Sequence, residues 1–292
     1  MKMRGSVLPH RLAQLAFAVA GLSLLAGQAS AASYEWTFNS GDLATGLGNG
    51  TMTYADGQTS TLTSFGNTGG GVPNIGGQTA SYLHVPVMPN PANGYYLTLN
   101  DTGPNGGGSY VNNYTVIYDL LSPGAANWTA LFNTDPANSS GNDADFYVAA
   151  DGSVGIGSGG YSAAGVIAPD TWYRLAFVDN GTSLSYYVNG AFVGQQTSGV
   201  SIDGRWSLYS NADPGADLLL FNEGDTSGNY THELYINSLA FVDRALTGSE
   251  LAALGGPAAP GILVPEPTTM CFLGLGLLGM GGRYFRRNPR RR

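Results

Sequence analysis

The 292-residue chain holds twelve basic and twenty acidic residues, and the two kinds are unevenly distributed along it. Nine basic residues lie before residue 12 or after residue 282, so residues 32–264 keep three arginines against nineteen acids, a net charge of −16. Such a body repels nucleic acid, because phosphate contacts need Lys and Arg. The single cysteine, Cys271, lies outside this body, whose stability must therefore come from an apolar core and not from a disulfide.

The first 31 residues show the three parts of a secretory signal peptide in the correct order. Three basic residues come first, an apolar run over residues 12–25 follows, and Ala29 and Ala31 are small residues at the positions that a signal peptidase reads. The apolar run is too short for a comfortable transmembrane helix. We therefore predict a signal peptide cleaved by signal peptidase after Ala31, and not a retained signal anchor.

Residues 32–256 read as β-structure almost throughout. Runs rich in β-branched and aromatic residues alternate with Asn-Gly and Asp-Gly pairs, which accept the positive φ of tight hairpins. The clearest predicted strands are residues 95–99, 114–121, 145–149, 172–178, 183–188, 216–221 and 232–242. The turn pairs are Asn49-Gly50, Asp56-Gly57, Asp151-Gly152, Asn180-Gly181, Asn189-Gly190 and Asp203-Gly204. This pattern predicts twelve to fourteen strands in one all-β sandwich or jelly roll.

One helix is expected at the end of this body. Thr247 and Glu250 have the spacing of a capping box, in which each side chain bonds to the backbone of the other residue. Two leucines give the helix one apolar side, and Gly255 ends it. Residues 257–264 then read as a linker.

Three segments resemble laminin-G-like domains of the concanavalin A-like fold. Residues 172–190 are similar to a family hairpin in which a Trp-Tyr strand precedes a Leu-x-x-Tyr-Val-Asn-Gly strand. Residues 235–246 resemble the last strand with its Arg-Ala-Leu turn, and residues 34–38 resemble the first strand. The match is good over residues 110–254. It implies a two-sheet antiparallel β-sandwich, a jelly roll, with both termini at neighbouring edge strands.

Calcium is the one cofactor that the sequence suggests, because two irregular loops offer the carboxylate and amide oxygens that calcium prefers. The first loop holds Asp135, Asn142, Asp143 and Asp145. The second, slightly favoured because it precedes the last strand, holds Asp213, Asp217, Asn222, Glu223 and Asp225. Many relatives carry an acid where Asn237 and Ser238 stand here, so the resemblance does not extend to a family-type calcium site. A solvated acidic surface is the alternative.

No catalytic motif stands out in the body. A retaining glycosidase needs two carboxyl groups about 5 Å apart. The nearest candidates, Asp143, Asp145 and Glu233, do not follow the Glu-x-Asp-x-x-Glu pattern of β-glucanases of this fold. No Gly-x-Ser-x-Gly nucleophile motif accompanies His84 or His232, so both histidines are expected to be structural. We therefore predict a protein without enzymatic activity.

A glycan-binding protein would need aromatic rings exposed on a strand face or a loop rim. Among the four tryptophans, Trp36 and Trp172 are expected in the core of the sandwich. Trp128, beside Asn127 in a turn-rich stretch, is the best candidate for an exposed ring that contacts a ligand.

The last 28 residues resemble the PEP-CTERM sorting signal of Gram-negative bacteria. Pro265, Glu266 and Pro267 precede a short Gly-rich hydrophobic stretch, predicted to be helical over residues 268–282, and an Arg-rich end over residues 283–292. The hydrophobic stretch is shorter than the roughly 20 residues of a stable span, so it predicts a transient stop in the inner membrane with the arginines on the cytoplasmic side. The resemblance implies processing by an exosortase near the Pro-Glu-Pro triplet, followed by release to the cell surface or an exopolysaccharide matrix.

Three functions fit these observations. The first is a non-catalytic surface or matrix protein that binds glycan or another protein. The second is an extracellular glycoside hydrolase, which a close, buried carboxyl pair would favour. The third is a purely structural matrix component without a specific ligand. Because unrelated functions share this fold, only the site can decide among them.

Overall fold

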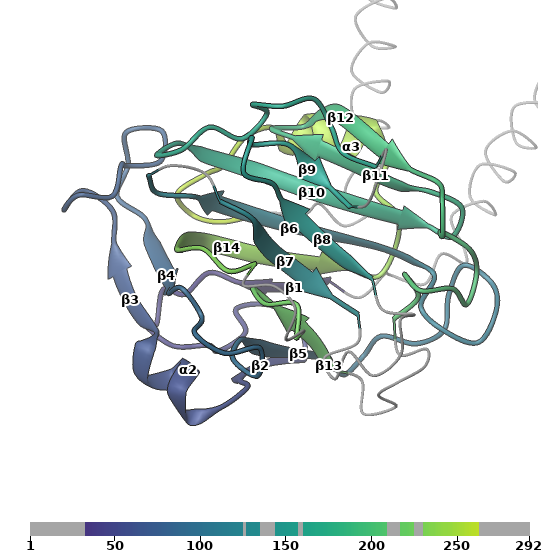
Figure 1. The fold of residues 1–292 in the computed structure, drawn as a ribbon, viewed down its shortest axis with the longest axis horizontal. Helices are drawn as coiled ribbons and strands as arrows, with labels where there is room; N and C mark the ends of the chain where they lie inside the picture. The colour runs from purple at the N-terminus through teal and green to yellow at the C-terminus, as the bar shows by residue number, and fades with distance from the viewer. Residues whose placement is uncertain are drawn as a thin grey trace, which may run out of the picture. The chain divides into compact units, whose positions relative to one another are not determined.

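The computed structural model describes residues 33–124, 127–134, 144–156, 160–208, 217–224 and 230–262. Within these ranges the chain forms fourteen strands in two antiparallel sheets (Figure 1), which confirms the predicted all-β jelly-roll sandwich. The signal peptide, the hydrophobic stretch predicted over residues 268–282 and the Arg-rich end lie outside the described residues.

One sheet has eight strands, and its middle is made of three strands of nine residues. Its members are β1 (Ser33–Trp36), β3 (Ser64–Asn67), β4 (Ser81–Val85), β6 (Asn113–Leu121), β10 (Trp172–Asn180), β11 (Leu184–Val188), β12 (Ala191–Gln196) and β14 (Leu234–Val242). The spatial order is β12-β11-β10-β6-β14-β4-β3, with β1 paired to the end of β14. Nearly every side chain of β6, β10 and β14 is buried, which explains their almost continuous apolar runs.

The first and last strands are neighbours, but they are not both at a sheet edge as expected. Tyr34 of β1 lies opposite Phe241 of β14. The opposite side of β14 pairs with β6. The first residues of β14 pair with β4. The expectation of two edge strands is therefore wrong. β1 lies at an edge, since β14 is the only named strand that it pairs with, whereas β14 lies inside the sheet between β6 on one side and β4 and β1 on the other.

The other sheet has six strands, arranged in the order β2-β5-β13-β7-β8-β9. They are β2 (Gly50–Tyr54), β5 (Tyr95–Leu99), β7 (Thr129–Asn133), β8 (Asp145–Val148), β9 (Val154–Gly155) and β13 (Asp217–Leu220). In β8, Phe146 and Val148 are buried, whereas Asp145 and Tyr147 are only half-buried. Because strand side chains alternate between faces, Asp145 and Tyr147 lie on the outer face of the sandwich.

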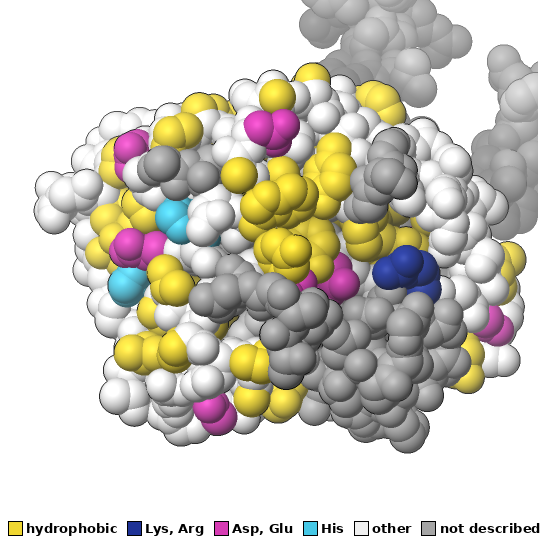
Figure 2. Space-filling model, in the orientation of Figure 1, with side chains coloured by type: hydrophobic (Ala, Val, Ile, Leu, Met, Phe, Trp, Pro, Cys, Tyr) yellow, Lys and Arg dark blue, Asp and Glu magenta, His cyan; other side chains and the backbone are white. Residues whose placement is uncertain are grey.

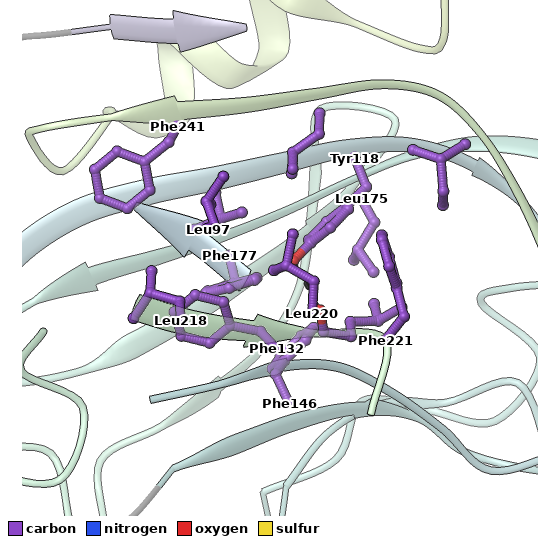
Figure 3. Close-up of a cluster of buried hydrophobic side chains, with 14 of the residues drawn as sticks. Leu97, Tyr118, Phe132, Phe146, Leu175, Phe177, Leu218, Leu220, Phe221 and Phe241 are labelled. Atoms are coloured by element: carbon purple, nitrogen blue, oxygen red, sulfur yellow. Dashed lines mark hydrogen bonds between the residues drawn. The ribbon is translucent and has the colours of Figure 1, made fainter. Parts of the chain in front are cut away.

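The core lies between the two sheets and is rich in aromatic rings (Figure 3). Phe146 of the six-stranded sheet stacks on Phe177 of the eight-stranded sheet, with ring centroids 4.6 Å apart. Phe132 meets the same ring edge-on at 5.2 Å. Trp36 and Trp172 are buried as predicted.

The outer face of the eight-stranded sheet is covered by the helix α3 (Gly248–Leu254) and by the residues that follow it. The capping box of Thr247 and Glu250 is present, which confirms the predicted start of this helix. Leu251 and Ile262 are buried in a cluster with Ile117 of β6. The part of the predicted linker that the structure describes, as far as Ile262, thus packs against the domain.

A second short helix, α2 (Gly57–Leu62), was not predicted. Asp56-Gly57 reads as a hairpin turn, yet the Asp56 carboxylate accepts a 2.7 Å hydrogen bond from the Thr59 backbone and caps this helix. The segment has no apolar periodicity that would have indicated a helix. Neither of the two described helices has the length and hydrophobicity needed to cross a membrane.

Candidate functional site

Trp128 is the only one of the four tryptophans that is not buried. Three tyrosine rings surround it, all nearly edge-on. The centroid distances are 6.1 Å to Tyr147, 5.6 Å to Tyr161 and 5.9 Å to Tyr230. Edge-to-face contacts at this spacing are favourable for aromatic pairs. We call these four residues the aromatic platform.

The platform is assembled from four separate parts of the chain. Trp128 directly precedes β7, and Tyr147 lies on the outer face of β8. Tyr161 forms a backbone bridge with Gly155 of β9. The Tyr230 carbonyl accepts a 2.8 Å hydrogen bond from the Ala130 backbone. The four rings therefore gather beside β7, β8 and β9, the last three strands in the order of the six-stranded sheet, and each ring is partly exposed.

A surface hollow of about 440 Å³ opens beside the Trp128 ring. Its lining residues are Trp128, Ala149, Ala150, Asp151, Ser153, Tyr161 and Ser162. Asp151 is exposed, and its Oδ1 accepts hydrogen bonds from the Ser153 hydroxyl at 2.7 Å and the Ser153 backbone at 2.9 Å. These bonds lower the pKa of Asp151, so the hollow carries an ionised carboxylate at neutral pH.

At the other side of the platform, two carboxylates meet the Tyr147 hydroxyl. This hydroxyl donates to Glu223 Oε2 at 2.9 Å, and it also interacts with the Asp145 carboxylate. Burial, together with these two negative neighbours, raises the pKa of Tyr147, so the phenol stays protonated. Glu223 itself is only 4 % exposed, and its carbonyl accepts a 2.5 Å hydrogen bond from Asn133.

The surface view agrees with this arrangement. Figure 2 shows a hydrophobic patch over the region where β7, β8 and β9 lie in Figure 1. Acidic side chains appear both above and below that patch. An aromatic surface flanked by carboxylates can stack on an apolar ligand face and accept hydrogen bonds from polar or cationic ligand groups.

The described residues of the predicted calcium loop, Asp217, Asn222 and Glu223, have separate structural roles. Asp213 and Asp225 lie outside the described residues, and Asp217 belongs to β13. The Asn222 amide donates to the carbonyls of Asn90 and Asn93 at 2.9 and 3.0 Å, so it holds a neighbouring loop. Glu223 instead contacts Tyr147, beside Asp145 of the other predicted loop.

The structure therefore joins two carboxylates that the sequence assigned to separate loops. Within the described ranges, no group of three or more His, Cys, Asp and Glu side chains has the arrangement of a metal site. Calcium binding stays a prediction.

His84 has contacts that sequence reasoning missed. Its Nδ1 lies 3.0 Å from the Ser64 hydroxyl, and its Nε2 lies 2.8 Å from Glu233 Oε1. Ser64 and His84 face each other across β3 and β4, a pairing that only the strand register reveals. The order hydroxyl, imidazole, carboxylate resembles that of a nucleophilic site. The His84 ring also stacks on the Tyr235 ring, with the two ring centroids 5.1 Å apart. The residues that line the aromatic hollow do not include any of these three.

Sequence comparison identifies the C-terminal segment. Residues 263–287 match the PEP-CTERM protein-sorting motif. This motif indicates an exported protein that is sorted to the cell envelope or surface and processed by exosortase during export. The predicted sorting residues Pro265, Glu266 and Pro267 fall within the matched segment, whereas the positions of both cleavages stay predictions. No curated protein matches the chain.

Solved structures similar to this chain are β-sandwich jelly-roll domains with low sequence identity. Domain 4 of AbnA, a GH43 extracellular arabinanase from Geobacillus stearothermophilus solved with arabinotriose, is 20% identical with a TM-score of 0.45, covering 78% of this chain and 100% of that one. The botulinum neurotoxin type G receptor binding domain is 13% identical with a TM-score of 0.45, covering 77% and 50%. The binding domain of Paraclostridial Mosquitocidal Protein 1 is 12% identical with the same TM-score, covering 77% and 50%. The chain thus spans about half the length of the two toxin domains.

Proposed function

We propose that this exported protein is a non-catalytic polysaccharide-binding protein of the cell surface or exopolysaccharide matrix, and that the aromatic platform is its binding site. The observation that carries the proposal is the half-buried Trp128 ring beside the 440 Å³ hollow. Sugar rings have apolar C–H faces that stack on aromatic side chains, while Ser and Asp groups at the rim accept or donate hydrogen bonds.

Several features support binding without catalysis. The most accessible part of the platform is aromatic, whereas Glu223 is almost fully buried and already accepts a hydrogen bond from the Tyr147 hydroxyl. A catalytic carboxyl must reach the glycosidic bond of its substrate. In this proposal Glu223 and Asp145 position Tyr147 and give the platform its negative charge.

Glycoside hydrolysis is the second candidate, because the Asp145 and Glu223 carboxylates both interact with the Tyr147 hydroxyl. Retaining glycosidases likewise use two carboxyl groups that lie close together. The binding experiment therefore includes an assay for sugar release.

The experiment uses the full-length chain in a mild detergent and a panel of oligosaccharides, with and without calcium. Trp128→Ala is expected to weaken binding at least tenfold. The matched control is Phe192→Ala on β12, which removes a ring that is 57% exposed on the other sheet, and it is expected to leave affinity unchanged. Equal binding by Trp128→Ala and the wild type would place the site elsewhere.

Release of reducing ends is measured in the same samples. Sugar release that disappears in Glu223→Gln would overturn the non-catalytic proposal in favour of the hydrolase. Binding that needs calcium, and that Glu223→Gln weakens only in its presence, would support the predicted calcium site. Binding to none of the sugars would leave a structural or protein-binding role.

A further inference from the structure

We infer that the ligand of the aromatic platform is a polysaccharide whose sugars carry protonated amines. This inference rests on the proposed function and specifies its ligand class. The observation behind it is the distribution of charge around the four rings.

The surface of the body offers little positive charge that could attract an acidic polymer. Residues 32–264 contain three arginines and no lysine. Arg174 is buried in an ion pair with Asp119, and Arg244 is paired with Glu250 at 2.8 Å. The third, Arg205, is half-buried, and Figure 2 shows one basic side chain beside the hydrophobic patch. With a net charge of −16, this body attracts cations and repels uronic or sulfated sugars.

The hollow beside Trp128 contains the groups that an ammonium ion prefers. Asp151 is exposed there, and its hydrogen bonds from Ser153 keep it ionised well below neutral pH. An alkylammonium gains a charge-assisted hydrogen bond from a carboxylate and a cation–π attraction from a tryptophan face. Trp128, Tyr161 and Asp151 line one hollow, so a single sugar amine can reach both kinds of group.

Negative charge is repeated at the other side of the platform. Asp145 and Glu223 both lie near the Tyr147 hydroxyl. Because Glu223 is almost fully buried, these two carboxylates add to the negative potential on this side of the platform without contacting the ligand. Figure 2 shows acidic side chains above and below the patch and one basic side chain beside it, and this mainly negative surround agrees with a ligand that carries positive charges.

The test compares four hexasaccharides for binding to the full-length chain at pH 6. They are β-linked glucosamine, its N-acetylated form, glucose, and mannuronate. We expect the glucosamine hexamer to bind at least tenfold more tightly than its acetylated form, and the mannuronate hexamer to bind least. Added salt is expected to reduce this preference, because screening weakens charge–charge attraction.

Asp151→Asn is expected to reduce the preference for glucosamine over its acetylated form to threefold or less, because the amide keeps a hydrogen-bond acceptor in the hollow but removes the negative charge. Asp42→Asn is the matched control. Asp42 is also exposed and accepts a hydrogen bond from the backbone two residues later, but it precedes β2, at the opposite edge of the six-stranded sheet. The control is expected to keep the full preference.

The outcomes separate this inference from the proposed function. Equal affinity for both glucosamine forms, or strongest binding of mannuronate, would overturn the amine preference while leaving glycan binding intact. Equally tight binding of a polylysine peptide would also overturn it, because charge without the sugar would then suffice. Failure of every hexamer to bind would reject the proposed function itself.

Discussion

Arg174 forms a two-pronged ion pair with Asp119 beneath the C-terminal segment of the domain. The guanidinium Nε and Nη2 lie 2.7 Å from the two carboxylate oxygens, and the side chains are 5% and 0% exposed. Arg174 also donates to the carbonyls of Leu254 and Gly261, and the Ala258 backbone donates to Asp119. The pair therefore ties the residues after α3 to the outer face of the eight-stranded sheet.

Arg174→Met should lower the free energy of unfolding by about 3–5 kcal/mol, because it leaves the Asp119 charge buried without its counter-ion. Urea denaturation of the full-length chain measures this loss. Arg244→Met is the matched control. It removes a partly exposed ion pair with Glu250 and should cost about 1 kcal/mol or less. Similar losses in both variants would show that the buried pair has no special role.

Ile262→Ala should destabilise the domain by about 2–4 kcal/mol, because Ile262 is 1% exposed in the cluster beneath α3. Ile202→Ala removes the same atoms from a side chain that is 50% exposed and should cost about 0.5 kcal/mol or less. Thermal unfolding compares the two. A negligible effect at Ile262 would mean that the segment before the sorting motif is a linker after all.

The free energy of unfolding should fall as pH rises from about 4 to about 7, because of the titration of Asp179. Burial raises the pKa of Asp179 to about 7, whereas the unfolded chain titrates near 4. In this window the folded state holds a proton that the unfolded state releases, so each pH unit costs up to about 1.4 kcal/mol. Asp179→Asn keeps an acceptor for the Gly181 backbone but removes the titration. Between pH 5 and pH 8 the wild type should lose stability relative to this variant, and parallel curves would contradict the assignment.

Gly190→Ala should destabilise the protein more than Gly181→Ala. Both glycines have positive φ, 80° and 78°, so both substitutions carry roughly 1–2 kcal/mol of backbone strain. A Cβ at residue 190 would also lie 2.7 Å from the Leu251 carbonyl of α3, whereas at residue 181 the nearest atom is 3.5 Å away. Chemical denaturation measures both variants. Equal losses would show that α3 moves aside without cost.

Features that depend on neighbouring residues could be predicted from the sequence. The Asn189-Gly190 hairpin and the Thr247 capping box follow from turn and cap chemistry, and both are present. The alternation in β8 separates Phe146 from Tyr147, because successive strand side chains point to opposite faces. The sorting motif is likewise a property of one continuous segment. The exception is Asp56-Gly57, where the same residue types cap a helix instead of forming a hairpin turn.

Only the tertiary structure decided which distant residues meet. Tyr161 and Tyr230 come from separate loops, and no periodicity connects them with Trp128. Asp145 and Glu223 meet through the strand order β13-β7-β8, and Ser64 faces His84 through the register of β3 and β4. Strand order and register are set by burial of the whole apolar core, a sum over contacts between residues far apart in the chain. The sequence by itself therefore determined the β-sandwich class and the export signals, whereas the folded core decided the composition of the site.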